Sequence, residues 1–308
     1  MIKIREHIGR DPKPLVSVHI ITYNQKNFIH ETLRSVLDQS YENMEIVVAD
    51  DGSTDGTAEV IVDYARQHPD RIVPLVGGAN LGVTGNCNRG LEACTGKYIA
   101  FMGGDDIFLP EKILRQVEWF EDDDERVLCG HQVEVFYDDG SPSHLLTRQL
   151  RAGRGPRDYI RRGTLFGGTS VMIRSDCAPK GGFDSALGLV SDGLFFTETL
   201  MNGGKFGYIL GVHARYRKHD SNITNQWERC VNDLGIYFDI IKERYPQYAF
   251  DAQIGEANLL DYGRGLKGLQ EGDALKALRF FLHGIKKNPM GCKLWIRLVQ
   301  ATFAALHF

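Results

Sequence analysis

Short apolar runs and amphipathic helical patterns alternate over the first hundred residues, and this alternation constrains the fold more than any other feature. The apolar runs are rich in β-branched residues, which is typical of strands buried on both faces of a sheet. Strands are predicted at 15–21, 44–50, 71–76 and 97–102, and helices at 28–39, 54–68 and 84–94. Strands that alternate with helices form a parallel sheet covered by helices on both faces. We therefore predict an α/β fold with a mostly parallel sheet flanked by helices.

The middle of the chain gives a weaker pattern. A strand is predicted at 165–174, and a helix at 190–204 that ends in a pair of glycines. Residues 206–219 read as one bent strand or as two short ones. We therefore expect this part of the chain to add strands to the sheet, with a less regular order than in the first hundred residues.

From Trp227 onward the pattern is helical throughout. Leucines recur at helical spacing in two sets, which Gly272 separates. The pair resembles a tetratricopeptide hairpin, but a binding array needs about three such repeats for stability. We predict an α/β domain at 1–225 and an all-helical extension at 226–308.

Charge and cysteine content exclude some classes of protein. The formal net charge of -4 over 308 residues argues against a nucleic-acid-binding protein, which needs a basic surface. The six cysteines are scattered without metal-binding spacing, as in proteins of a reducing compartment. The first residues lack the apolar core of a signal peptide, and no apolar run approaches the ~20 residues of a membrane span. We expect a cytoplasmic protein.

Polar and acidic residues follow three of the predicted strands. Thr22–Asn24 follow the first, Asp50–Asp51 the second, and Asp105–Asp106 the fourth after two glycines. Ligands of parallel sheets bind at the carboxyl ends of the strands. Adjacent carboxylates repel each other unless a cation lies between them, and Mg²⁺ commonly bridges carboxylates and substrate phosphates. One acid could instead cap the next helix, but a doublet favours a metal–diphosphate site.

Longer stretches resemble a known family. These are "VSVHIITYNQKNFIHETLRSVLDQSYENMEIVVADDGSTDGT", "NLGVTGNCNRGLEACTGKYIAFMGGDD", and "GLVSDGLFF" followed by "YRKHDSNIT". Over roughly residues 15–220 the chain resembles the family 2 glycosyltransferases, which have the GT-A fold. The resemblance implies a nucleotide-sugar donor and a divalent cation, Mn²⁺ or Mg²⁺.

The resemblance also implies roles for individual residues. Donor binding is implied for Thr22, Tyr23, Asn24, Asp51 and Asp105. Metal binding is implied for Asp106, at the end of the family's DxD position, and for His219, where some members add a ligand. Asp192 falls where the family places its catalytic base. The alternatives are that Asp192 caps a helix and that His219 is a surface residue.

Two positions depart from the family pattern. Ser191 precedes Asp192 where a Glu is usual, and Cys87 stands where many members have an Arg. Arg89 or Arg217 would then have to make the diphosphate contact. Neither departure removes the carboxylates that the reaction needs.

The expected function is that of a metal-dependent, inverting hexosyl- or deoxyhexosyltransferase. The acceptor would be a hydroxyl of a glycan or lipid-linked molecule, in cell-surface polysaccharide biosynthesis. One alternative is a non-catalytic nucleotide-sugar-binding or scaffold protein. Another is a sugar nucleotidyltransferase, which needs a glycine-rich basic loop where "TYNQKNF" stands.

The tail at 293–306 is amphipathic. Its apolar face comprises Leu294, Trp295, Leu298, Val299, Ala305 and Leu306, and it is edged by Arg297 and Lys293. An apolar face edged by cations suits a membrane–water interface, which predicts peripheral contact with the inner face of a membrane. Alternatively, the same face packs on the helical pair at 258–287.

Overall fold

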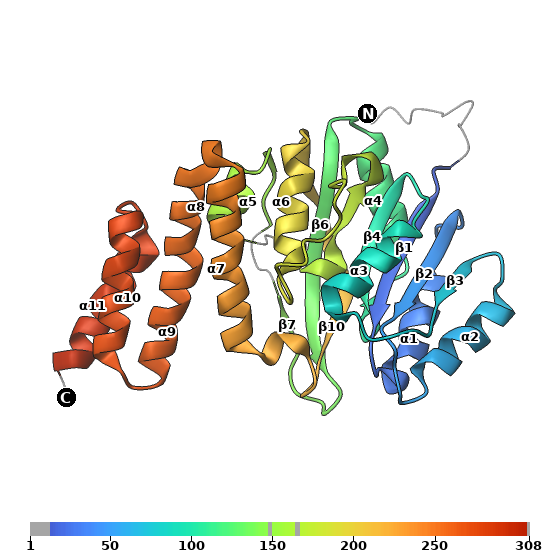
Figure 1. Ribbon diagram of the computed structural model, residues 1–308, viewed down its shortest axis with the longest axis horizontal. Helices are drawn as coiled ribbons and strands as arrows, with labels where there is room; N and C mark the ends of the chain where they lie inside the picture. Colours follow the sequence, from blue (N-terminus) through green and yellow to red (C-terminus); the bar gives the residue numbers. More distant parts are fainter. Residues whose placement is uncertain (1–12, 147–149, 164–166, 307–308) are drawn as a thin grey trace, which may run out of the picture.

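The computed structural model describes residues 13–146, 150–163 and 167–306. Over these residues a single mixed sheet forms the centre of the molecule (Figure 1). Its strands are β1 (Val16–Thr22), β2 (Met44–Asp50), β3 (Ile72–Leu75), β4 (Tyr98–Gly103), β5 (Ile107–Phe108), β6 (Arg126–Tyr137), β7 (His144–Leu145), β8 (Gly153–Arg154), β9 (Met172–Arg174) and β10 (Lys205–Lys218). The main path runs β3-β2-β1-β4-β9-β6-β10-β5, with β7 beside β6 and β8 beside β10.

The first four strands are parallel, as the alternating sequence predicts. β1 lies between β2 and β4, and β2 pairs with β3. In the register, Thr22 is opposite Asp50 and Ile21 is opposite Gly103. The carboxyl ends of β1, β2 and β4 therefore meet at one edge of the sheet.

Helices cover both faces of the sheet. They are α1 (Lys26–Leu37), α2 (Thr57–Gln67), α3 (Gly82–Glu92), α4 (Lys112–Glu121), α5 (Arg157–Arg162) and α6 (Ser191–Met201). Helices α1, α2 and α4 share one core with the sheet, and α3, α5 and α6 share another. Along β4, Ala100 faces the first core and Phe101 the second, because successive side chains of a strand point to opposite faces.

The irregular region differs from its sequence-based prediction. The strand predicted at 165–174 is shortened to β9, because Gly168–Ser170 form a tight helical turn, and 164–166 lie outside the described residues. β9 runs antiparallel to β4 and β6. Strand β5 was not predicted: Ile107 and Phe108 pair with β10 immediately after the acidic doublet. β10 is one strand with irregular register between Tyr208 and Ala214.

The last part of the described chain is helical, as predicted. It comprises α7 (Trp227–Arg244), α8 (Ala249–Glu256), a π-helical segment (Ala257–Asp261), α9 (Tyr262–Gln270), α10 (Ala274–Lys287) and α11 (Cys292–Leu306). Helices α7 and α8 share a core with residues of α5 and α6, whereas α9, α10 and α11 pack around Phe281 and Leu294. In Figure 1, α10 and α11 lie at the end of the molecule remote from β3.

The domain boundary at 225/226 stays a prediction. Helix α7, which follows this boundary, shares an apolar core with α6, which precedes it. Within the described ranges, no helix is both long enough and apolar enough to span a bilayer.

Candidate active site

The loops after β1, β2 and β4 are joined through their backbones. The amide of Asp51 donates to the Thr22 carbonyl at 2.9 Å, and the amide of Gly104 donates to the Ile21 carbonyl at 2.9 Å. The sequence predicts that these loops share one edge, and the structure brings Thr22, Asp51 and the acidic doublet together there. All of these side chains are largely buried.

The two glycines before the doublet are required by close contacts. A Cβ on Gly104 would lie 2.5 Å from Gln25 Oε1 and 2.6 Å from Thr22 Cβ. A Cβ on Gly103 would lie 2.8 Å from Asp105 Oδ1. The chain can therefore turn after β4 and bring two carboxylates against the β1 loop only because side chains are absent at both positions.

Thr32 of α1 holds the backbone of this turn through its hydroxyl. Its hydroxyl lies 3.0 Å from the Gly104 carbonyl oxygen and 2.8 Å from that of Asp106. Sequence analysis missed Thr32, because a threonine on the buried face of a helix gives no signal of the loop that it contacts.

The loops around the expected base and ribose site are well ordered by hydrogen bonds. Asp51 Oδ1 accepts from the Leu81 amide at 2.7 Å, and Asn24 Oδ1 accepts from the Thr54 amide at 2.8 Å. Asn24 has a left-handed backbone with φ of 51°, which asparagine tolerates better than most residues. Tyr23 is 49% exposed, so its ring is available to a ligand. Asn24 thus stabilises the conformation of the loop after β1. The Tyr23 ring and the Asp51 carboxylate lie at the carboxyl-end edge of the sheet.

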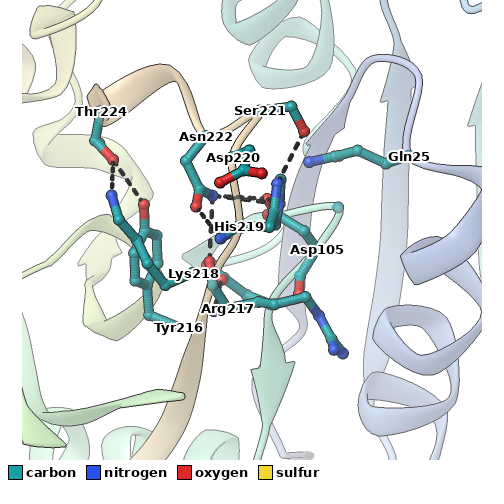
Figure 2. A network of polar contacts seen from close by, with 12 residues as sticks. Gln25, Asp105, Tyr216, Arg217, Lys218, His219, Asp220, Ser221, Asn222 and Thr224 are labelled. Atoms are coloured by element: carbon teal, nitrogen blue, oxygen red, sulfur yellow. Dashed lines mark hydrogen bonds and ion pairs between the residues drawn. The ribbon is translucent and has the colours of Figure 1, made fainter. Parts of the chain in front are cut away.

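Asp105 belongs to a polar network with the end of β10 (Figure 2). Its Oδ2 lies 2.9 Å from His219 Nε2 and accepts from the side-chain Nδ2 of Asn222 at 3.4 Å. His219 Nδ1 lies 2.9 Å from the Ser221 hydroxyl, and the imidazole stacks on Phe28 with 4.8 Å between ring centroids. His219 is therefore a positioned member of the acidic site and not a free surface residue.

Asp106 is a buried acid without sufficient compensation. Burial and the neighbouring Asp105 raise the pKa of Asp106 well above its usual value, although the Arg217 amide donates to its Oδ1 at 3.1 Å. The Arg217 guanidinium is used elsewhere: it donates to the Asp105 carbonyl at 3.0 Å and pairs with Glu31 and Asp138. A divalent cation would supply the missing positive charge.

The residues present fit such a cation. The described residues contain no preformed cluster of three His, Cys, Asp or Glu ligands. Mg²⁺ at nucleotide sites usually takes one or two carboxylates and completes its shell with phosphate oxygens and water. A buried acidic doublet with an imidazole beside it matches that ligand set.

The two arginines that could substitute for the missing diphosphate contact at Cys87 both bind protein groups. Arg89 donates to the Gly77 carbonyl at 3.1 Å and to Asn86 Oδ1 at 2.8 Å, and it also contacts the Asp50 carbonyl. The Arg217 guanidinium binds the Asp105 carbonyl, Glu31 and Asp138. Burial raises the pKa of the Cys87 thiol to about 12, so Cys87 stays neutral at physiological pH. In this structure both guanidinium groups are occupied by the protein itself.

Asp192 is the second residue of α6 and lies in the first turn of that helix. The N-cap position is Val190, with no side-chain cap, so Asp192 is not the cap residue that the alternative reading expected. Its Oδ1 accepts from the Gly193 amide at 2.8 Å. Burial raises the pKa of Asp192 to about 6, and the backbone amides keep it from rising further. A carboxylate with this pKa can take up a proton near neutral pH.

Residues of the turn Gly168–Ser170 lie near two of the acidic groups. A Cβ on Gly168 would lie 3.8 Å from Asp192 Oδ2. The neighbouring Thr169 is buried, and its hydroxyl is one of the groups that lower the pKa of Asp106. Thr169 was not predicted from the sequence. Adjacent residues of one turn therefore lie near Asp192 and Asp106.

Known structures with this architecture define its class. The chain resembles Staphylococcus aureus TarS 1–349 in complex with UDP-GlcNAc, with a TM-score of 0.63 and 18% identity over 88% of this chain and 81% of that one. It also resembles a mannosyltransferase from Pyrobaculum calidifontis in complex with GDP-Man and Mn²⁺, with a TM-score of 0.59 and 18% identity over 94% and 88%. The fold is the GT-A fold of glycosyltransferases.

The sequence assigns the chain within that class. Residues 17–178 match the family described as Glycosyl transferase family 2, and the chain belongs to this family. The putative teichuronic acid biosynthesis glycosyltransferase TuaG of Bacillus subtilis is 38% identical over 74% of this chain and 89% of its own length. The chain spans only 37% of the length of the first mycobacterial relatives that it matches. The chain thus belongs to a family of glycosyltransferases, as its sequence predicted.

Proposed function

We propose that this glycosyltransferase uses a divalent cation and moves a hexosyl or deoxyhexosyl group, with inversion, from a nucleotide-diphosphate donor to a hydroxyl. The acceptor is a glycan or a lipid-linked molecule, and the product enters cell-surface polysaccharide on the cytoplasmic side of the membrane. One observation carries the proposal: adjacent residues of the 168–170 turn lie near the buried carboxylate of Asp106 and near the separate carboxylate of Asp192.

The donor half of the site lies at the ends of β1 and β2. Tyr23 offers an exposed ring on which a base can stack. Asp51 uses one carboxylate oxygen on the Leu81 amide, which leaves the other for a ribose hydroxyl. The titles of the similar TarS and mannosyltransferase structures name UDP-GlcNAc and GDP-Man, which supports a nucleotide-sugar without deciding between bases.

Asp106, with His219 and Asp105 beside it, would hold the cation. When bound, Mn²⁺ or Mg²⁺ supplies Lewis-acid stabilisation of the charge on the departing nucleoside diphosphate. The protein contributes the position of these ligands: Arg217 orients Asp106 through its amide, and Asn222 and Ser221 orient Asp105 and His219. The Mn²⁺ named with the similar mannosyltransferase supports this assignment.

Asp192 would accept the proton of the attacking hydroxyl. An alcohol is a weak nucleophile, and a positioned base typically contributes ~10²–10⁴-fold to the rate. Asp192 and the Asp105–Asp106 doublet are separate carboxylate groups, one for the acceptor hydroxyl and one for the cation and diphosphate. We propose that attack occurs opposite the leaving group, which gives inversion at the anomeric carbon.

Asp192→Asn tests this role. The substitution removes the base but keeps the size of the side chain, so donor affinity should change less than about twofold while kcat falls by ~10²–10⁴-fold. Isothermal titration with the nucleoside diphosphate and Mn²⁺ measures the first quantity, and initial rates measure the second. An unchanged kcat would assign Asp192 to helix structure only.

We also propose that the C-terminal helices contact a membrane, but through a strip of α11 that only partly coincides with the predicted face. Leu294 and Leu298 of the predicted apolar face pack in the core that α9 and α10 share, whereas Trp295 and Val299 of that face are exposed. These two residues and Ile296 form a strip that we call the outer face of α11: Trp295 is 48% exposed, Ile296 60% and Val299 52%. No acidic residue occurs in α11. We propose that the outer face rests on an anionic lipid surface.

A further inference from the structure

Helix α7 of the helical extension holds the loop that leads to Asp192. The carboxylate of Asp233, which is buried, accepts from two consecutive amides of that loop. Its Oδ2 lies 2.9 Å from the Gly188 nitrogen and 2.6 Å from the Leu189 nitrogen. These amides precede Asp192 by four and three residues, so the anchor lies immediately before the first turn of α6.

The same face of α7 makes two further contacts with this part of the chain. Tyr237 is one helical turn after Asp233, and its hydroxyl lies 3.0 Å from that of Thr197 on α6. Thr197 in turn donates to the Gly193 carbonyl at 2.7 Å, next to Asp192. Arg244, at the end of α7, pairs with Asp184 at 2.5 Å at the beginning of the loop. One helix thus fixes both ends of the loop and the first turn of α6.

The two bonds of Asp233 are of a strong type. A carboxylate that accepts from backbone amides forms charge-assisted hydrogen bonds, which are about twice as strong as neutral ones. If the carboxylate were removed, two amides in a half-buried loop would lose their partner, and the loop would relax towards other acceptors. Among the described residues, Thr84 of α3 is the only other side chain that forms a hydrogen bond with residues 187–189. Its hydroxyl donates to the Leu187 carbonyl at 2.5 Å.

We propose that Asp233 is a positioning residue: by holding the Gly188 and Leu189 amides, it sets the place of the Asp192 carboxylate relative to the acceptor hydroxyl. The inference rests on the proposed role of Asp192 as the base. A base must come within about 2.6–3.2 Å of the proton that it takes, and a misplacement of 1 Å can cost ~10²-fold in rate. Helix α7 thus helps to position the proposed base, although it follows the part of the sequence that resembles the GT-A family.

The test compares Asp233→Asn and Asp233→Ala with wild type in the full chain. Asparagine keeps one neutral acceptor oxygen, whereas alanine keeps none. We expect kcat to fall about threefold to tenfold for the first variant and ~10²-fold for the second, with donor KM within twofold of wild type. Hydrogen exchange should accelerate at 188–193 and stay unchanged in β1 and β4.

Asp239→Asn is the matched control. Asp239 lies on the same helix, but its side chain is 67% exposed, and its one ion pair among the described residues is with Lys242, at 3.4 Å. This variant should match wild type in every readout. If the alanine variant does not fold, the asparagine variant and its hydrogen exchange still decide the question.

Asp192→Asn in the same assays separates the two hypotheses. If Asp192→Asn abolishes turnover but the Asp233 variants keep wild-type kcat, the positioning role is overturned and the proposed base stands. If the Asp233 variants lose donor affinity as much as kcat, Asp233 serves general stability and the positioning role is again overturned. If Asp192→Asn keeps full turnover, the proposed base is wrong, and the positioning role falls with it.

Discussion

Asp106 illustrates how a functional residue can cost stability. Its pKa is raised by burial and by Asp105, so the folded protein holds a proton there more tightly than the unfolded chain does. The sign follows from linkage: an acid with a raised pKa in the folded state destabilises the fold above the unfolded pKa of about 3.9, and the cost disappears below it. At neutral pH and without metal, Asp106 should therefore destabilise the fold.

Asp106→Asn should accordingly separate stability from function. Without metal at pH 7, we expect a melting temperature equal to or above that of wild type, because the amide removes the repulsion and still accepts from the Arg217 amide. Mn²⁺ together with a nucleoside diphosphate should stabilise wild type more than the variant. Thermal unfolding with and without Mn²⁺ measures both effects. A large fall in the metal-free melting temperature, or equal stabilisation of the two proteins, would contradict the metal assignment.

The pH dependence of turnover should report Asp192. A general base works only when ionised, and the pKa of Asp192 is raised to about 6 by burial. We expect kcat/KM to rise as pH increases through about 6 and to level above 7, with about a tenfold loss per unit below pH 5. Rates measured from pH 4.5 to 8 at saturating Mn²⁺ give the profile, and the donor dissociation constant at each pH is the control. A profile that is flat down to pH 4.5 would remove Asp192 as the base.

The sequence identified some of these residues and not others, for a physical reason. Asp105, Asp106 and Asp192 stand in motifs next to strand and helix ends, so local pattern and family resemblance are enough to single them out. Thr32, Thr169 and Asn222 act on residues 63 to 117 positions away in the chain. Such contacts depend on register and packing, which a single sequence does not encode in any local pattern.

At the scale of elements, the regular strands and helices were predictable and the short ones were not. Strands β1, β2 and β4 are continuous buried runs, which the apolar pattern indicates directly. β5 and the 168–170 turn contain two and three residues, too few for any periodicity. Yet both lie beside the acidic doublet, so the elements that position the site carry the weakest sequence signal.

The turn between β4 and β5 gives a prediction at this scale. Gly104→Ala would place a methyl group against Gln25 and Thr22, and overpacking of this kind typically costs about 1–3 kcal/mol. We expect a lower free energy of unfolding together with weaker Mn²⁺-dependent donor binding, because the doublet would be displaced. Gly181→Ala is the control, since a Cβ there has no neighbour within 4 Å. Equal urea midpoints and equal donor affinities for the two variants would refute the close packing.

At the scale of the whole molecule, the alternation of strands and helices predicted the α/β fold with its helical extension. It did not predict that α7 would share a core with α6, or that α11 would bury one face and expose another. Both features depend on which helices meet in space. An amphipathic pattern reveals an apolar face but not its partner.

The outer face of α11 gives a prediction for the whole molecule. The double substitution of Trp295 and Ile296 by Ser should reduce flotation with anionic liposomes about tenfold, and wild type should not float with neutral ones, since each nearby cation adds about 1 kcal/mol on an anionic surface. Leu210→Ser is the control, because Leu210 is 81% exposed on β10, away from α11. Failure of wild type to float at low salt would exclude membrane contact, and a shift in oligomeric size upon substitution would assign the face to a second copy of the chain.

The central claim is inverting transfer that depends on a divalent cation, and the anomeric configuration of the product tests it most directly. The purified protein is incubated with a panel of nucleotide-sugars and hydroxyl acceptors, with Mn²⁺, with Mg²⁺ and with chelator, and the new linkage is read by NMR. We predict a product only when a cation is present, with the anomeric configuration opposite to that of the donor. A product with the donor's configuration, or equal transfer in chelator, would contradict the account.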